Sequence, residues 1–330
     1  MRPKEKEMKK ALVISILILF AATSLFIGCK QKEAAKEPVK EVIEFPTKPI
    51  KLVVYTGPGG AGDILSRKFT DIASKYTDAT FVVENKAGAG GIVAMEYVAT
   101  TKPDGYTLMY MTKSNVSKLV TTDSELDPMT FDWISQMQID PECIITNVNN
   151  PVNTWEQIVA DAKAKGGDQL WLGPAAGGLD HVTAQMIWKA AGIEAKWVPF
   201  ASGGKAVAGL LGEQGITYVG NPGETIGKPD LKVAAIAAAE RLPQFPDVPT
   251  FKELGIEGLE NEIMWRGFAV KAGTPDSIIE WYDDIFEKVT NDPDWIAAYA
   301  PMGNMLVHKT RKEFNKLVQA DYDAYKAARQ

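Results

Sequence analysis

Short apolar runs alternate with amphipathic segments from residue 50 onward, and this alternation is the main structural signal in the sequence. Residues 50–55 read IKLVVY and predict a buried strand. The next segment, 63–76, predicts a helix, because four apolar residues recur at spacings of four, three and four: Leu65, Phe69, Ile72 and Tyr76. Asp63 at the start of this segment predicts an N-cap.

The alternation continues to the C-terminus. Further strands are predicted at 80–83, 106–111, 141–148, 169–172, 195–199, 216–219, 233–237 and 265–270. Further helices are predicted at 92–100, 154–165, 180–191 and 205–211, then from Pro275, and at 310–328. Thr154 and Gln157 form a capping box, and three prolines predict a loop at 241–250. Strands alternating with helices predict an α/β fold.

The strand at 265–270 is predicted to return to the first group of strands, which splits one lobe around the other. The first lobe would comprise 47–147 and 264–330, and the second lobe 148–263. A chain of 330 residues is long enough for two domains of ordinary size.

Glycine-rich loops follow four of the predicted strands, and each precedes a predicted helix. They read GPGGAGD at 57–63, NKAGAGG at 85–91, GPAAGG at 173–178 and FASGG at 200–204. Glycine allows close approach of the backbone to a ligand, and the free N–H groups of a helix start attract anions. Ligands of open α/β sheets bind at the carboxyl ends of the strands. If the lobes face each other, the four loops would therefore converge on one cleft.

The first loop also fits the dinucleotide pattern G-x-G-x-x-G, at Gly57, Gly59 and Gly62. It lies between a strand and a helix, and Glu84 ends the next strand 22 residues after Gly62. An NAD(P)-dependent oxidoreductase is therefore one alternative, and a tight turn without a ligand is another. The further glycine-rich loops are not needed by a dinucleotide domain, and they favour a different small-molecule site.

The N-terminus has the pattern of an export signal. Residues 1–10 carry five basic residues, whereas 11–28 carry no charge. An uncleaved membrane anchor is the alternative. The sequence LFIG before Cys29 resembles a bacterial lipoprotein signal, which implies removal of 1–28 and lipidation of Cys29. Residues 29–46 would then form the lipidated N-terminus and a flexible tether on the outer side of the membrane. An exported location counts against the oxidoreductase, because its cofactor is scarce outside the cell.

Charge and cysteine content narrow the possible partners. Removal of 1–28 leaves 31 basic and 40 acidic residues, a net charge of −9, which argues against nucleic acid and anionic lipid surfaces. Cys143 would be the one remaining thiol besides Cys29, so no internal disulfide is expected. Two distant histidines and no cysteine pair argue against a metal site, and no cofactor is expected.

Six segments in order resemble the substrate-binding proteins of bacterial tripartite tricarboxylate transporters, the Bug or TctC family. They are FPTKPI at 45–50, PGG at 58–60 with Asp63, ENKAGAGG at 84–91, KPDGYTL at 102–108, VPF at 198–200 running on to Gly212, and FPDVPT at 245–250. The resemblance covers the chain from Phe45 to the C-terminus.

This resemblance implies a two-lobed periplasmic binding protein fold of type II that closes on its ligand. It implies a non-enzymatic, monomeric receptor that delivers its ligand to the large and small membrane subunits of a permease. The usual ligands of the family are carboxylates, including tricarboxylates, amino acids and aromatic acids, held by main-chain N–H groups and water from the first two loops. A sensing receptor with the same fold, without transport, is the remaining alternative.

The loops and the resemblance together nominate the ligand-binding residues. They are Thr56, Gly57, Pro58, Gly59, Gly60, Ala61, Gly62, Asp63, Ala87, Gly88, Ala89, Gly90, Lys113, Ser114, Asn115, Pro174, Ala175, Ala176, Gly177, His181, Phe200, Ala201, Ser202, Gly220, Asn221 and Trp265. For six of these a structural role is the alternative: capping for Asp63 and His181, core packing for Trp265, a solvated loop for Ser114 and Asn115, and a turn for Asn221.

Some loop residues depart from the family pattern. Ala61-Gly62 and Phe200 lack hydroxyl groups that relatives carry, and the loops offer no obvious arginine clamp. These differences suit a less polar acid or one bound through Lys113. His181 has no accompanying nucleophile motif, so a catalytic role is not expected.

Overall fold

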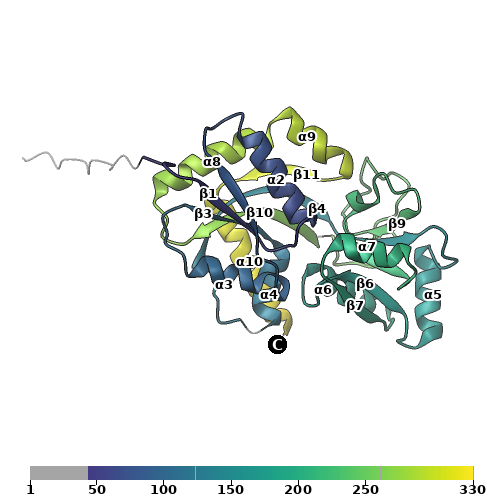
Figure 1. Cartoon of the computed structure of the whole chain (residues 1–330). Coiled ribbons are helices and arrows are strands. Elements are labelled where there is room, and N and C mark those ends of the chain that lie inside the picture. The colour runs from purple at the N-terminus through teal and green to yellow at the C-terminus, as the bar shows by residue number, and fades with distance from the viewer. Residues whose placement is uncertain (1–43, 123, 261, 330) are drawn as a thin grey trace, which may run out of the picture. The chain divides into compact units, whose positions relative to one another are not determined.

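The computed structural model describes residues 44–122, 124–260 and 262–329, which contain two β-sheets with helices on their faces (Figure 1). The predicted signal segment, the lipid attachment at Cys29 and most of the tether lie outside the described residues. The predicted α/β class is confirmed. None of the described helices is long and apolar enough to cross a membrane.

The first sheet has six strands in the order β11-β4-β10-β3-β1-β2. Their bounds are β1 Ile50–Val54, β2 Phe81–Asn85, β3 Thr107–Thr112, β4 Phe131–Pro141, β10 Ile263–Lys271 and β11 Met305–Lys309. β1 is parallel to β2 and β3, whereas β10 is antiparallel to both β3 and β4. The predicted return of 265–270 to the first group of strands is therefore confirmed.

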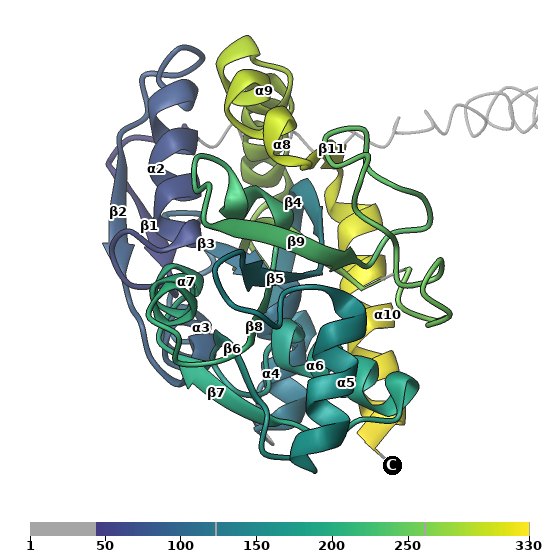
Figure 2. The same ribbon diagram turned by 90° about the vertical axis from the view of Figure 1, so that its right-hand side faces the viewer.

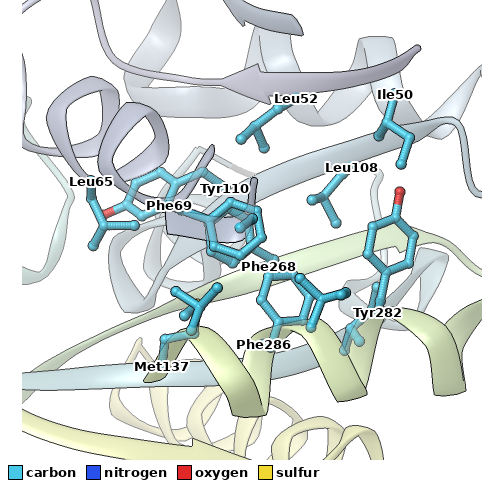
Figure 3. Close-up of a cluster of buried hydrophobic side chains, with 14 of the residues drawn as sticks. Ile50, Leu52, Leu65, Phe69, Leu108, Tyr110, Met137, Phe268, Tyr282 and Phe286 are labelled. Carbon is cyan, nitrogen blue, oxygen red and sulfur yellow. The ribbon is translucent and has the colours of Figure 1, made fainter. Parts of the chain in front are cut away.

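Helices cover both faces of this sheet. They are α2 Ala61–Ala73, α3 Ile92–Ala99, α4 Lys113–Thr121, α8 Asp276–Thr290, α9 Pro293–Tyr299 and α10 Arg311–Arg329, with short 3-10 turns at Ala89–Gly91 (η1), Pro128–Thr130 (η2) and Ala300–Met302 (η4). On one face, Phe69 of α2 and Phe286 of α8 pack on Phe268 of β10, as Figure 3 shows. On the other face, Leu119 of α4 and Phe314 of α10 belong to a second core.

The second sheet has five strands in the order β7-β6-β8-β5-β9 (Figure 2). Their bounds are β5 Cys143–Asn147, β6 Leu170–Pro174, β7 Lys196–Phe200, β8 Thr217–Gly220 and β9 Leu231–Ile236. Its helices are α5 Trp155–Lys165, α6 Leu179–Ala191 and α7 Gly203–Leu211, with a 3-10 turn at Pro222–Thr225 (η3). α5 and α6 share one core with the sheet and α7 shares another, so this sheet is also covered on both faces.

The chain passes between the sheets at two adjacent points. β4 ends at Pro141 in the first sheet, and β5 begins at Cys143 in the second. The return to β10 begins beside this crossing. There the Glu142 amide donates a hydrogen bond to the Glu262 carbonyl at 3.1 Å. Two neighbouring backbone crossings are the arrangement that a hinge requires.

Several local predictions were wrong for identifiable reasons. The N-cap of α2 is Gly60, and Asp63 lies inside the helix, where its side chain accepts from the Gly59 amide. Pro275 is the N-cap of α8 rather than its first residue. α4 went unpredicted because its capping box pairs Thr112 with an asparagine, Asn115. β4 was not predicted, because its sequence FDWISQMQID buries polar side chains and lacks an apolar run; the strand predicted at 141–148 corresponds to β5.

Candidate functional site

A pocket of about 400 Å³ is lined by residues that follow strands of both sheets. Thirteen of the residues nominated from the sequence lie in its wall: Thr56, Ala61, Gly62, Ala87, Gly88, Ala89, Gly90, Ser114, Pro174, Ala175, Ala201, Ser202 and Asn221. The structure thus brings together residues from all four glycine-rich loops, as the sequence predicted. Its volume lies within the range of small-molecule sites.

The first turn of α2 lies at this pocket. The first-turn amides of a helix have no partner within the helix, and Ala61 and Gly62 both line the pocket. There is no room for a side chain at Gly62, because a Cβ there would lie 2.5 Å from Cε1 of Tyr110. Among the described residues, the buried Thr56 hydroxyl has no hydrogen-bond partner. This end of the pocket is therefore suited to an anionic or carbonyl oxygen.

The second loop adopts a conformation that depends on glycine. Gly90 has φ +64°, and a Cβ there would lie 2.8 Å from Cε of Lys118. Lys118 lines the pocket and is 8% exposed. Burial lowers the pKa of its ammonium group. The glycine therefore allows the backbone to approach a buried lysine at the pocket wall.

The other nominated residues lie outside the pocket lining: Gly57, Pro58, Gly59, Gly60, Asp63, Lys113, Asn115, Ala176, Gly177, His181, Phe200, Gly220 and Trp265. Several of them hold the lining loops in place. The carboxylate of Asp63 accepts from the Gly59 amide at 2.9 Å, from Arg67 Nε at 2.9 Å and from Asn85 Nδ2 at 3.0 Å. Burial raises the pKa of Asp63, but these hydrogen bonds outweigh it and the net pKa is lowered. Asp63 thus links the first two glycine loops.

His181 and Asn115 also have structural partners. Nδ1 of His181 accepts from the Gly177 amide at 3.0 Å, and its ring packs against Trp197. Burial, with the nearby Lys118 charge, lowers the pKa of His181, which favours the neutral ring that can accept this bond. Asn115 Oδ1 accepts from the Thr112 amide at 2.8 Å and caps α4.

Lys113 and Trp265 lie against α10. The Lys113 ammonium lies 3.8 Å from carboxylate oxygens of both Glu262 and Asp321. The indole of Trp265 is fully buried and donates to Asp321 at 2.6 Å. Both side chains therefore have their partners on the face of the first sheet that α10 covers.

Helix α4 of the first sheet contacts the glycine loop of the second. Ser117 and Thr121 donate to the Gly177 carbonyl at 2.8 and 3.0 Å, and Lys118 Nζ donates to the Ala176 carbonyl at 2.9 Å. The Leu179 amide donates to Ser114 Oγ at 3.1 Å. Because these bonds join elements of the two sheets, they hold the pocket walls together on this side.

The pocket also contains a charged residue that the sequence analysis did not nominate. Arg266 on β10 lines the pocket, and three different residues hold its guanidinium group. Nε donates to Asp140 at 2.5 Å, Nη1 to the Tyr110 hydroxyl at 3.1 Å and Nη2 to Asn221 Oδ1 at 2.7 Å. One feature of the sequence could have identified Arg266: it lies within the apolar run IMWRGFAV, and an arginine in a buried strand needs a buried partner.

Three buried carboxyl groups surround this arginine. Asp180 and Glu224 line the pocket, and Glu142 accepts from Asn221 Nδ2 at 3.0 Å. Burial, reinforced by Glu224, raises the pKa of Asp180 to about 7. Burial also raises the pKa values of Glu142 and Glu224. The nearby negative charge of Asp180 raises the pKa of Glu142 further. The pocket lining therefore contains two buried carboxyl groups, Asp180 and Glu224, together with Arg266.

The remaining lining residues that were not nominated are Tyr55, Tyr110, Gly178, Gly203, Tyr218 and Met264. Most are bulky side chains inside or just after strands, where buried core residues have the same sequence pattern. Within the described ranges, no cluster of three or more histidine, cysteine, aspartate or glutamate side chains is placed to hold a metal ion.

Comparisons with known proteins place this geometry in context. The sequence model described as the tripartite tricarboxylate transporter family receptor matches residues 65–328. The UPF0065 protein in the gbd 5' region of Cupriavidus necator is 28% identical over 265 residues, which cover 79% of this chain and 80% of that protein. Protein BugT of Bordetella pertussis is 26% identical and covers 78% of this chain and 81% of its own length.

Solved structures show the same fold. A protein described as a periplasmic transporter superposes with a TM-score of 0.81 at 28% identity, covering 86% of this chain and 97% of that one. MatC from Rhodopseudomonas palustris with bound malate has a TM-score of 0.80 at 22% identity, with coverage of 86% and 99%. The similarity thus extends over both sheets and the pocket between them.

Proposed function

Since the chain belongs to the tripartite tricarboxylate transporter receptor family, we propose that it captures a small carboxylate in the pocket between its sheets and delivers it to a membrane permease. The observation that carries this proposal is the convergence of four glycine-rich loops, with the α2 amides, on one pocket. Proteins of the same fold support it, because one holds malate and another, from R. palustris, was solved with adipate.

Ligand capture would proceed by closure of the two halves around the hinge at Pro141 and Glu262. A ligand that touches loops from both sheets favours the closed state by its higher affinity for that state. Each amide contact to a carboxylate is worth about 1 kcal/mol or somewhat more. Several contacts are therefore needed for micromolar affinity, which corresponds to about −8 kcal/mol.

The nominated residues divide into two roles in this proposal. Those in the pocket wall contact the ligand directly, with the amides of Ala61 and Gly62 facing its carboxylate. Those outside the wall fix the loops, as Asp63 and His181 do. Closure then removes the ligand from water without a chemical step.

Export and anchoring are the second part of the proposal. The chain would be exported through residues 1–28 and attached to the membrane by lipid on Cys29, beside the large and small permease subunits. Cys29→Ser removes the attachment site, so the protein should move from the membrane fraction to the soluble fraction. Retention of Cys29→Ser in the membrane fraction would refute the lipid anchor.

Ligand capture is tested by a calorimetric titration of the purified protein. The panel comprises monocarboxylates, dicarboxylates, tricarboxylates, amino acids and aromatic acids, with NAD and NADP as negative probes. At least one acid should bind with micromolar affinity and raise the melting temperature by mass action. Binding of a dinucleotide with no binding of any acid would overturn the proposal.

A further inference from the structure

Helix α4, from the half of the molecule built on the first sheet, lies beside α6 and the loop that precedes it in the other half (Figures 1 and 2). Ser117 and Thr121 both donate to the Gly177 carbonyl of this loop, at 2.8 and 3.0 Å. Lys118 donates to the Ala176 carbonyl at 2.9 Å. Residues three and four apart share one face of a helix, so these side chains form one continuous contact. All three bonds join a side chain of one half to a main-chain oxygen of the other.

The Gly177 loop is held in place from within its own half. The Gly177 amide donates to Nδ1 of His181 at 3.0 Å, and the Gly178 amide donates to the Ala175 carbonyl at 3.4 Å. Gly177 has φ +78°, and a Cβ there would lie 2.7 Å from the Thr121 hydroxyl oxygen. Any other residue would therefore push the loop and α4 apart. The fixed loop thus presents its carbonyl to α4 at a distance that only glycine allows.

Helix α4 begins at the hinge and extends away from it. At its first residue, the Lys113 ammonium lies 3.8 Å from a carboxylate oxygen of Glu262, where the chain returns to β10. Thr121 ends the helix about 12 Å further along its axis, at 1.5 Å per residue. The displacement caused by a hinge rotation grows with distance from the hinge. A small opening of the halves should therefore break the Thr121 bond.

Two of the three side chains lie outside the ligand pocket. Lys118 lines the pocket, whereas Ser117 and Thr121 do not belong to its lining. Ser117 is fully buried, and Thr121 is exposed at the edge of the contact. Removal of either hydroxyl therefore keeps the residues of the pocket wall and deletes a bond between the halves.

We infer that Ser117 and Thr121 are positioning residues, which set the ligand affinity by holding the two halves closed. The inference rests on the proposed function, because it requires a ligand that is captured by closure. The ligand enters the open state, and the bonds to Gly177 form as the halves close. These bonds therefore slow the release of the ligand without assisting its first encounter with the protein. The apparent affinity decreases in proportion to the population of the closed state.

The test is a kinetic measurement of ligand binding by the full-length protein. Calorimetry gives the affinity, and stopped-flow tryptophan fluorescence gives the association and dissociation rate constants. The probe is the tightest binder among malate, adipate, citrate, glutamate and benzoate. Ser117→Ala and Thr121→Val should each increase the dissociation rate constant about two- to fivefold, and the double variant about five- to twenty-fivefold. The association rate constant should stay the same or increase.

Two further variants separate this role from a merely structural one. Thr121→Ser keeps the hydroxyl donor and should have the rate constants of the wild type. Thr100→Val is the matched control, because the exposed Thr100 hydroxyl donates at 2.7 Å to the Tyr97 carbonyl within one half; it should change neither rate constant. Melting curves verify that each variant folds.

The outcomes distinguish this inference from the proposed function. Unchanged rate constants in the double variant would overturn the inference and leave carboxylate capture intact, as would a loss of affinity that arises from slower association. Failure of Thr121→Ser to retain the dissociation rate of the wild type would also contradict it. No binding of any probe by the wild type would overturn both.

Discussion

Gly62→Ala should damage both the stability and the binding site, although it adds one methyl group. The new Cβ would lie 2.5 Å from Cε1 and 2.9 Å from Cδ1 of Tyr110, about 1 Å inside normal contact distance. The Tyr110 ring has little freedom to move. It is fully buried, stacks on Tyr55 with centroids 5.8 Å apart, and holds Arg266 through its hydroxyl.

The expected magnitude follows from two opposing effects. Overpacking of a buried site costs about 1–3 kcal/mol, whereas exchanging glycine for alanine in a helix returns up to about 1 kcal/mol. We expect a net loss of about 1–2 kcal/mol in the free energy of unfolding. We also expect at least about tenfold weaker ligand binding, because displacement of Tyr110 disturbs the wall and Arg266 together.

The matched control is Gly204→Ala, since Gly204 is the second residue of α7 as Gly62 is of α2. A Cβ at Gly204 would meet no atom within 4 Å, so this variant should be as stable as the wild type or slightly more stable. Chemical denaturation followed by circular dichroism gives the free energies, and calorimetry gives the affinities. If Gly62→Ala matches Gly204→Ala in both, the tight packing of α2 on Tyr110 is refuted.

Three other substitutions test other parts of the site. Arg266→Met should destabilise the protein by about 3–5 kcal/mol, because it leaves Asp140 buried without its cation. In a double-mutant cycle measured by denaturation, adding Asp140→Asn should recover part of this loss, whereas strictly additive effects would contradict the pairing. Lys118→Met removes the bond to the Ala176 carbonyl and should weaken ligand binding about three- to thirtyfold in calorimetry, whereas the exposed Lys163→Met should not. Because the pKa of Asp180 is raised in the folded protein, its ionisation lowers the free energy of unfolding as pH rises from about 4 to 7. Asp180→Asn should therefore raise the melting temperature at pH 8 more than at pH 4. An equal effect at the two pH values would argue against the raised pKa of Asp180.

The sequence was sufficient where a local pattern determines the structure. Apolar spacing predicted α2, and Thr154 with Gln157 marked the start of α5 through a capping box that the structure confirms. The four glycine-rich loops were found because each joins a strand end to a helix start. Their convergence then followed from the rule that ligands bind at the carboxyl ends of strands.

The charged wall of the pocket required the structure, because its members are far apart in the chain. Arg266 pairs with Asp140, 126 positions earlier, and no local pattern connects them. Asp180 begins the helix predicted at 180–191, but its burial depends on the packing of α6 against the second sheet. Lys113 and Trp265 were nominated from their positions beside strands, whereas their side chains lie against α10, which only tertiary contacts reveal.

Hydrogen–deuterium exchange with and without a bound acid tests the central claim most directly. If the ligand is enclosed by both halves, protection should increase together at residues 61–63 and 88–91 of the first half and at 175–179 and 202–205 of the second. Protection confined to one half, or centred on the separate surface pocket at residues 231–234 and 245–249, would contradict capture between the two sheets.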